Sequence, residues 1–434
     1  MTLNRRQFLA SASAFSMLPM PLWAATSTAH LRAEPVTQQI LPDGGPATNM
    51  LGFNGSMPGP TLRLQRGKRV NIEVENGLNE GTSVHWHGIR LANPMDGVPE
   101  LTQEIILPDG TKNYSFTPPD AGTFWYHSHY ISQEQVARGM MGVLIVEDDT
   151  PPDVDHDITV LISDWLMQDD GSLSKAFSDM HSMAHGGYMG NFARAFLSQT
   201  QVKLGDRVRF RLINGATNRI FPVAVDGISG KIVALDGMAL SVPRDVTDLV
   251  LAPAQRVDVI ADITGPVSFD MVSRQGAFNL ADLAVEGTNT VRQAAQIAPL
   301  APHWPPHPND PTQHLTLKMQ GGAMSGRHGG DNIWAFNDTS DLPQTPFGTF
   351  QRGETIKITM VNDTAFAHGI HLHGHHFYEV ADDGSLGDLR DTTLVNAGES
   401  QDIICVFDNP GRWLLHCHML SHAIGGMRTW VNVI

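Results

Sequence analysis

Three segments of the chain carry short runs in which apolar and polar residues alternate: RVNIEVEN (69–76), RVRFRLING (207–215) and TIKITMVND (355–363). Successive side chains of a strand point to opposite faces, so these runs predict β-strands. Each run follows an Arg-Gly or Gly-Asp turn and ends near an asparagine, which makes the three a weak internal repeat. The pattern therefore predicts one β-rich unit used three times.

Two stretches read as linkers between these units. EDDTPPDVDHD (147–157) is acidic and carries prolines, and APLAPHWPPHPNDPTQH (298–314) is rich in proline. The two linkers divide the mature chain into three domains of similar length, at 34–148, 153–300 and 310–434, and an export signal (1–25) precedes these domains. We expect an all-β protein built from three tandem Greek-key β-sandwiches.

Composition narrows the class of protein. The 434 residues include 41 Gly and 27 Pro, which suit many short strands joined by tight turns. The formal net charge of −16 argues against nucleic acid or an anionic membrane as partner, and it favours cationic substrates, including metal ions.

The amino terminus predicts export. Arg5 and Arg6 precede an apolar run that is too short and interrupted to span a bilayer, and the pattern resembles a twin-arginine signal. Cleavage is expected near Ala24 or Ala25, and the mature protein is expected in the periplasm. Exported proteins often contain disulfides, but this chain has only Cys405, within the apolar run DIICVF, and Cys417.

The segment RWLLHCHMLSHAIGGM (412–427) combines sulfur and imidazole ligands. In an extended strand, His416 and His418 share one face and Cys417 takes the other, so one peptide can serve two metal sites. His422 and Met427 lie far enough along for the chain to return to the cysteine's side. Two imidazoles, a thiolate and a distant thioether are the ligands of a blue-copper centre, so one further histidine is needed. Cys405 is then expected to be a buried strand residue.

Histidines recur at a spacing of two more often than chance predicts. Random placement of the 20 histidines would give about one His-x-His pair, and the sequence has five. Each pair alone is compatible with a structural role, but together they predict a metal site between the first and third domains. A zinc site closes with four ligands and would leave most of these histidines unused. The motifs are VHWHG (His85, His87), YHSHY (His127, His129), HGIHLHGHH (His368, His371, His373) and HCH (His416, His418).

This set of motifs resembles the multicopper oxidase family over essentially the whole mature chain. The resemblance implies cupredoxin-like domains and four copper ions: one type 1, one type 2 and a type 3 pair. It implies that His368, Cys417 and His422 hold the type 1 copper, with Met427 as weak axial ligand, and that His85 and His371 hold the type 2 copper. The implied type 3 ligands are His87, His127, His129, His373, His416 and His418.

The resemblance also implies an activity. Electrons from a reducing substrate enter at the type 1 site and pass along the Cys417 peptide to the other coppers, where O₂ is reduced to water. Asp96 matches the family's proton-supplying aspartate, and we favour this role over that of a turn aspartate before Gly97, which is common for Asp-Gly in general. Ala423 stands where many bacterial relatives have a glutamate, so a second proton relay is in doubt. His375 and His376 are assigned to the ligands' surroundings or to the surface.

The reducing substrate is less clear from the sequence. Two Gly-rich stretches, at 178–191 and 318–330, contain methionines and histidines that could bind soft Cu(I). The alternative is that both are flexible loops whose methionines only pack against the protein. We therefore consider a laccase-like oxidase of phenols and aromatic amines, a periplasmic cuprous oxidase, and a non-catalytic copper-binding protein, in each case as a monomer. A copper nitrite reductase is disfavoured, because two-domain enzymes of that kind do not need the doubled set of histidine pairs. The candidate accessory copper ligands are Met180, His181, Met183, His185, Met189, Met319, Met324 and His328.

Overall fold

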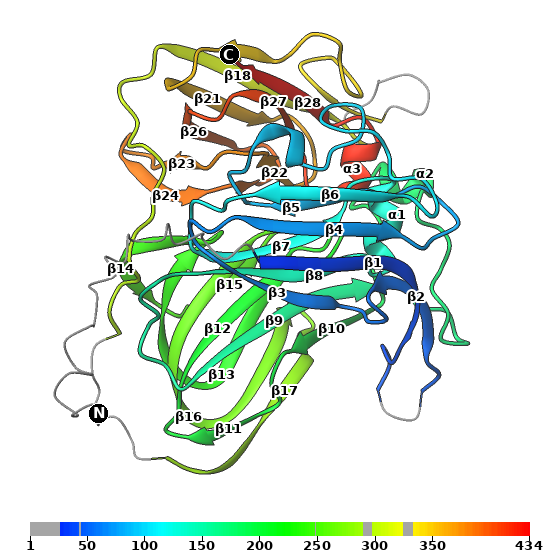
Figure 1. The fold of residues 1–434 in the computed structure, drawn as a ribbon, viewed down its shortest axis with the longest axis vertical. Helices are drawn as coiled ribbons and strands as arrows, with labels where there is room; N and C mark the ends of the chain where they lie inside the picture. The colour runs from blue at the N-terminus through cyan, green and yellow to red at the C-terminus, as the bar shows by residue number, and fades with distance from the viewer. Residues whose placement is uncertain (1–26, 43–44, 248, 290–296, 324–332) are drawn as a thin grey trace, which may run out of the picture.

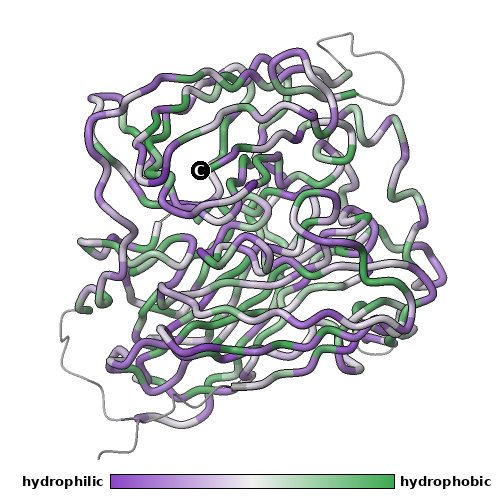
Figure 2. Tube along the Cα trace, turned by 45° about the horizontal axis from the view of Figure 1, so that its top comes forward, coloured by the Kyte–Doolittle hydropathy of each residue, from purple (hydrophilic) through white to green (hydrophobic). Residues whose placement is uncertain are grey.

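The computed structural model describes residues 27–42, 45–247, 249–289, 297–323 and 333–434. Nearly all regular structure is β, arranged in three consecutive groups of strands (Figure 1). Apolar and polar positions alternate along many of the strands (Figure 2), as expected for sheets with one face in a core. The proposed signal peptide lies outside the described residues.

The first domain packs two four-stranded sheets, in the orders β2-β1-β4-β6 and β3-β8-β7-β5. A 3₁₀ turn, η1 (Asn93–Met95), and a short helix, α1 (Ser132–Ala137), lie in its connections. Its strands are β1 (Ser27–Gln38), β2 (Thr48–Phe53), β3 (Gly59–Gln65), β4 (Val70–Asn76), β5 (Val84–His87), β6 (Thr111–Phe116), β7 (Gly122–Ser128) and β8 (Met141–Glu147).

The second domain forms one nine-stranded sheet that curls on itself (Figure 1). Its long strands β13 and β16 contain register shifts, which bend a sheet. The elements are β9 (His156–Trp165), α2 (Met180–Met183), β10 (Phe192–Leu197), β11 (Gln201–Leu204), β12 (Arg207–Asn214), β13 (Phe221–Leu235), β14 (Met238–Asp245), β15 (Leu249–Leu251), β16 (Arg256–Ser273) and β17 (Gly276–Thr288).

The third domain packs a six-stranded sheet, β19-β18-β21-β26-β23-β24, on a five-stranded sheet, β20-β28-β27-β22-β25. The elements are β18 (Gln313–Gly321), β19 (Trp334–Phe336), β20 (Gly348–Phe350), β21 (Glu354–Asn362), β22 (His368–Leu372), β23 (Phe377–Val380), β24 (Leu386–Arg390), β25 (Thr392–Val395), β26 (Ser400–Phe407), β27 (Gly411–Cys417), α3 (Leu420–Ile424) and β28 (Arg428–Val433).

The weak sequence repeat corresponds to one recurring structural unit. Its three segments form β4, β12 and β21, and each of these strands has a parallel neighbour on one side and an antiparallel one on the other. The terminal asparagines Asn76, Asn214 and Asn362 are buried, and each donates from its side-chain amide to two or more backbone carbonyls. These asparagines therefore fix the loop that follows each strand. The all-β prediction with three β-sandwich domains is confirmed.

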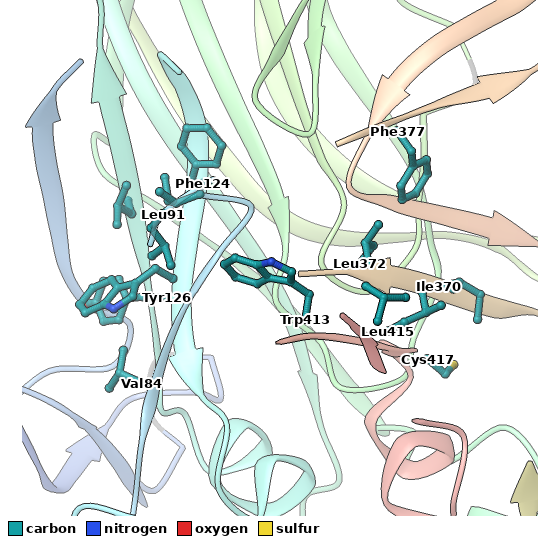
Figure 3. Close-up of a cluster of buried hydrophobic side chains, with 14 of the residues drawn as sticks. Val84, Leu91, Phe124, Tyr126, Ile370, Leu372, Phe377, Trp413, Leu415 and Cys417 are labelled. Carbon is teal, nitrogen blue, oxygen red and sulfur yellow. The ribbon is translucent and has the colours of Figure 1, made fainter. Parts of the chain in front are cut away.

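Many buried side chains of the first and third domains belong to one continuous hydrophobic cluster, whereas most of those of the second domain form a separate cluster, and a third cluster joins the first and second domains. Figure 3 shows Phe124 and Tyr126 of β7 in the same cluster as Trp413 and Leu415 of β27. The histidine-bearing strands of the two domains are therefore held face to face by shared packing. Cys405 is buried in this cluster, as predicted for a strand residue.

Candidate metal centres

Strand register brings the histidine motifs of each domain together in pairs. In the first domain, β5 and β7 are antiparallel, and His85 lies opposite His127. In the third domain, β22 and β27 are antiparallel, and His371 lies opposite His416. Directly opposite residues share a face of the sheet, so each strand pair presents its histidines as one group.

The two groups meet at the interface between the first and third domains. The imidazole rings of His85 and His373 have centroids 4.0 Å apart, and those of His87 and His371 are stacked at 3.8 Å. Both pairs join a residue of the first domain to one of the third. The cluster, which we call the eight-histidine cluster, consists of His85, His87, His127, His129, His371, His373, His416 and His418.

The ring nitrogens of this cluster fit a set of metal ions. The Nδ1 atoms of His85, His371 and His127 lie 2.8–2.9 Å from backbone carbonyl oxygens, while their Nε2 atoms are buried with no hydrogen-bond partner among the described residues. The Nε2 atoms of His373 and His416 face each other at 3.1 Å. Ligating histidines typically use one nitrogen for a protein acceptor and offer the other to the metal.

Burial keeps these imidazoles in the form that binds metals. Burial, reinforced by neighbouring imidazoles, holds the pKa of His87, His127 and His371 well below the ordinary value of 6.5. Burial likewise lowers the pKa of His416 to about 3. Neutral imidazoles carry the free lone pair that a metal requires, so these four side chains are ready to bind metal at neutral pH.

A second group, which we call the Cys417 site, lies within the third domain. The Sγ atom of Cys417 is 3.6 Å from Nδ1 of His368 and 3.8 Å from Nδ1 of His422, and the two Nδ1 atoms are 3.0 Å apart. All three side chains are buried. This triangle of one sulfur and two nitrogens is the trigonal donor set of a blue-copper centre.

Neighbouring groups orient the ligands of the Cys417 site. Nε2 of His368 is 2.8 Å from the hydroxyl of Thr364, and Nε2 of His422 donates to the carbonyl oxygen of His185 at 2.9 Å. Both Nδ1 atoms are thereby turned inward. Met427 is fully buried, and its carbonyl oxygen accepts from the amide N–H of Cys417 at 3.1 Å. The structure therefore places Met427 next to the proposed ligand.

The thiol itself needs a cation to ionise. Figure 3 shows Cys417 beside Ile370 at the edge of the hydrophobic cluster, and burial raises the pKa of the thiol to about 12. A metal ion supplies the positive charge that turns such a thiol into a thiolate. The donor set and its apolar surroundings therefore fit copper.

The two centres are joined by three consecutive residues. His416 and Cys417 end β27, and His418 follows directly. His416 and His418 have ring centroids 5.5 Å apart within the eight-histidine cluster, while Cys417 faces His368 and His422. Alternation along the strand thus connects the centres through covalent bonds.

Sequence comparisons identify the family of this arrangement. Three profiles described as multicopper oxidase match residues 36–151, 156–296 and 307–434. The chain belongs to the multicopper oxidase family.

Three of the similar proteins come from bacteria or from an environmental sample. The crystal structure of Lac15 from a marine microbial metagenome is 50% identical, has a TM-score of 0.82, and covers 94% of this chain and 100% of its own. Multicopper oxidase MmcO of Mycobacterium tuberculosis is 29% identical over 94% of this chain and 87% of its own length. Copper resistance protein A of Escherichia coli is 26% identical over 92% of each.

Membership of the multicopper oxidase family confirms the predicted class of activity. The chain is a copper-binding oxidoreductase that takes electrons from a reducing substrate and uses O₂ as acceptor. Its three domains are of the cupredoxin-like kind. Among the described residues, no helix has the length and apolarity needed to cross a membrane.

Asp96 of this multicopper oxidase lies at the eight-histidine cluster rather than at the surface. Its carbonyl oxygen accepts from Nδ1 of His85 at 2.8 Å, and its Oδ2 is 3.0 Å from Nδ1 of His373. Gly97 follows with φ +85°, and a Cβ there would lie 1.8 Å from the carbonyl oxygen of Val84. The Asp-Gly turn therefore packs directly on the histidine-bearing strand.

The structure places the candidate accessory ligands in different surroundings. The segment 178–191 lies over the Cys417 site: the carbonyl of His185 contacts His422, and the amide of Tyr188 donates to Ser421 at 3.1 Å. The rings of His181 and His185 have centroids 4.3 Å apart. Met180 and Met189 are exposed, Met183 is buried, and Met319 is fully buried in the core of β18, where packing explains it; Met324 and His328 lie outside the described residues.

The sequence assigns His375 and His376 to the ligands' surroundings or to the surface, and the structure buries both. Other residues at the site carried no sequence signal. Asp391 contacts His87, with 3.2 Å between its Oδ1 and the Nε2 of the histidine, yet it is remote from every histidine motif in sequence. Trp334 packs against His422, and the centroids of their rings are 4.3 Å apart. Neither Asp391 nor Trp334 belongs to a motif with a recognisable spacing, so the sequence does not reveal their contacts with the histidines.

Proposed function

We propose that the chain binds four copper ions. His368, Cys417 and His422 hold the type 1 ion with Met427 as axial ligand, His85 and His371 hold the type 2 ion, and the other six histidines of the eight-histidine cluster hold the type 3 pair. The observation that carries the proposal is the shared peptide from His416 to His418, which serves both centres. Bound copper supplies one-electron transfer and the reduction of O₂.

Asp96 is the proposed proton-supplying residue. It is buried, its carboxylate contacts His85 and His373, and its Oδ1 has no hydrogen-bond partner among the described residues. That oxygen lies 3.3 Å from Nδ1 of His85 and retains the capacity to accept a hydrogen bond from a water beside the histidines. Its contacts support this role over that of a simple turn residue.

For the reducing substrate we propose a phenol or aromatic amine, with Cu(I) as the second candidate. Proteins named laccase are among the relatives, and so are copper resistance proteins. The observation favouring Cu(I) is the segment 178–191, which carries exposed Met180 and Met189 and paired His181 and His185 above His422. Thioethers and imidazoles suit soft copper ions.

One experiment separates the two substrates. Oxygen uptake is measured with Cu(I) and with a substituted phenol, each with and without added Cu(II). Replacing Met180 and Met189 with Leu removes two exposed thioethers and conserves apolar bulk. Cu(I) oxidation and any Cu(II) stimulation of phenol oxidation should fall several-fold if this segment delivers electrons, while the basal phenol rate stays intact.

The matched control is Met183→Leu, because Met183 is 6% exposed and Met180 is 45% exposed. A change confined to the apparent affinity for bulky phenols would instead make the segment a lid on the substrate site. Unchanged kinetics with both reductants would remove the accessory copper proposal and leave the four-copper proposal standing.

We also propose that the protein is exported through its twin-arginine signal and acts in the periplasm as a monomer. Arg5 and Arg6 followed by Gln-Phe-Leu support the export proposal. Replacing both arginines with lysine should retain the protein in the cytoplasm, as fractionation would reveal. Light scattering during size-exclusion chromatography should give the mass of one chain, and a dimer mass would contradict the monomer proposal.

A further inference from the structure

Asp391 holds two histidines of the cluster in the same manner as Asp96. Its carbonyl oxygen accepts from Nδ1 of His371 at 2.8 Å, and its Oδ1 is 3.2 Å from Nε2 of His87. Asp391 therefore uses its main chain on a histidine of its own domain and its carboxylate on a histidine of the other domain. Asp96 divides its two contacts in the same way.

These contacts decide which ring nitrogens face the interior of the cluster. With Nε2 turned to Asp391, His87 leaves Nδ1 buried and without a hydrogen-bond partner in the part of the chain that the structure describes; His371 leaves Nε2 in the same state. Nδ1 of His87 and Nε2 of His371 are therefore among the ring nitrogens of the cluster that could bind metal ions. The position of Asp391 thus fixes the direction in which two proposed ligands point.

Asp391 is itself fixed by an arginine of the second domain. Nη1 and Nη2 of Arg256 donate to Oδ1 and Oδ2 of Asp391 at 2.9 and 2.6 Å. The rest of the guanidinium donates to the carbonyl oxygens of Thr123, Ala254 and Asp236, at 3.1, 3.0 and 2.9 Å, so every N–H is used. Arg256 therefore joins all three domains. Within the described parts of the chain, no arginine or lysine contacts Asp96 in this way.

The residue after His87 leaves room for this ion pair. Gly88 has φ +85°, and a Cβ at that position would lie 2.5 Å from Nη2 of Arg256 and 2.6 Å from Oδ2 of Asp391. Any larger side chain would displace the pair. The first domain thus leaves the space, the second supplies the arginine, and the third supplies the carboxylate.

We propose that Asp391, held by Arg256, is a positioning residue that orients His87 and His371 toward the metal ions of the eight-histidine cluster. The proposal rests on the proposed four-copper function and adds a second carboxylate with a role distinct from that of Asp96. It also gives the second domain, which supplies none of the ligands proposed for the four coppers, a part in building the cluster.

The test is Asp391→Asn. Oδ1 of Asp391 serves both His87 and Nη1 of Arg256, and Oδ2 serves Nη2. An amide has one oxygen and one NH₂ group, so one of these two positions becomes a donor that faces N–H groups, and the two-oxygen grip of Arg256 on the side chain that orients His87 is broken. Copper per chain is measured after dialysis against a graded series of chelator concentrations, and blue absorption follows the Cys417 site separately. We expect the cluster to hold copper about 10–100-fold more weakly, the typical cost of losing an oriented partner of a ligand, with the blue copper retained as in the parent protein.

Asp236→Asn is the matched control, because Asp236 is a buried aspartate whose carboxylate accepts from the backbone N–H of Arg256 and contacts none of the histidines that the structure describes. It should keep cluster copper at parental affinity. Parental cluster affinity in Asp391→Asn, or equal losses in both variants, would overturn the proposal. Fewer than four coppers in the parent protein would instead overturn the proposed function.

If Asp391→Asn does not fold, Arg256→Lys takes its place. Lysine keeps the positive charge but cannot bond both carboxylate oxygens as a planar fork, so Asp391 loses its fixed orientation. The same selective loss of cluster copper is expected. Parental affinity at both centres in Arg256→Lys would overturn the proposal.

Discussion

The Cys417 site and the eight-histidine cluster are built in different ways. The Cys417 site takes its three closest donors from β22, β27 and α3 of the third domain. The cluster takes four histidines from the first domain and four from the third, and it exists only where the two domains dock. One centre depends on folding within a domain, and the other depends on packing between domains.

The second domain touches both centres without supplying a ligand proposed for the four coppers. The carbonyl oxygen of His185 accepts from His422 at the Cys417 site, and Arg256 bonds Asp391 at the cluster. The two centres can therefore be disturbed separately: the Cys417 site through its ligands within one domain, and the cluster through the contacts that hold the domains together.

The largest expected effect is that of Cys417→Ser. A hydroxyl does not replace the thiolate, so the blue colour should disappear and oxidation of every reductant should cease. Copper per chain should fall from four to three, because the eight histidines are unchanged. Absorption spectroscopy and metal analysis test this, and a variant that stays blue would refute the ligand assignment.

Asp96→Asn should act on the cluster alone. Removing a proton-donating carboxylate typically slows a reaction by about 10²–10⁴-fold. We expect O₂ turnover to fall within that range while single-turnover reduction of the blue copper stays fast. Unchanged turnover under saturating O₂ would return Asp96 to the role of a turn residue.

Acid should weaken the copper-free protein. Burial lowers the pKa of His422 to about 4 and that of His416 to about 3, below the ordinary 6.5. The unfolded chain binds these protons first, so the stabilising contribution is complete above pH 6.5 and is lost as the pH falls toward 4 and 3. Each such histidine contributes a slope of up to about 1.4 kcal/mol per pH unit. Denaturant titrations at pH 7 and pH 5 measure it, and equal stability at both would contradict these shifts.

The smallest expected effect is that of Met427→Leu. Leucine conserves the buried volume and removes only the weak axial sulfur, so the protein should stay folded, blue and active. A redox titration should show a raised type 1 potential. Loss of the copper would mean that Met427 is a primary ligand.

Much of this architecture could be predicted from the sequence because it rests on short-range spacing. Period two in a strand placed His416 and His418 opposite to Cys417, and the structure has this alternation in β27. The three alternating runs with their asparagines likewise predicted the repeated strands β4, β12 and β21.

The contacts of Asp391, Arg256 and the His185 carbonyl could not be predicted in this way. Each joins segments far apart in the chain, and Asp391 belongs to no motif. The role of His185 at His422 is that of a main-chain oxygen, which every residue has, so no residue type marks it. Such contacts follow from how the domains dock.

Crystals of the copper-loaded protein, with anomalous diffraction recorded at the copper edge, test the central claim most directly. The account predicts four copper peaks per chain: one among Cys417, His368 and His422, and three among the eight histidines. Copper at the Cys417 site with none or only one ion in the cluster would contradict it.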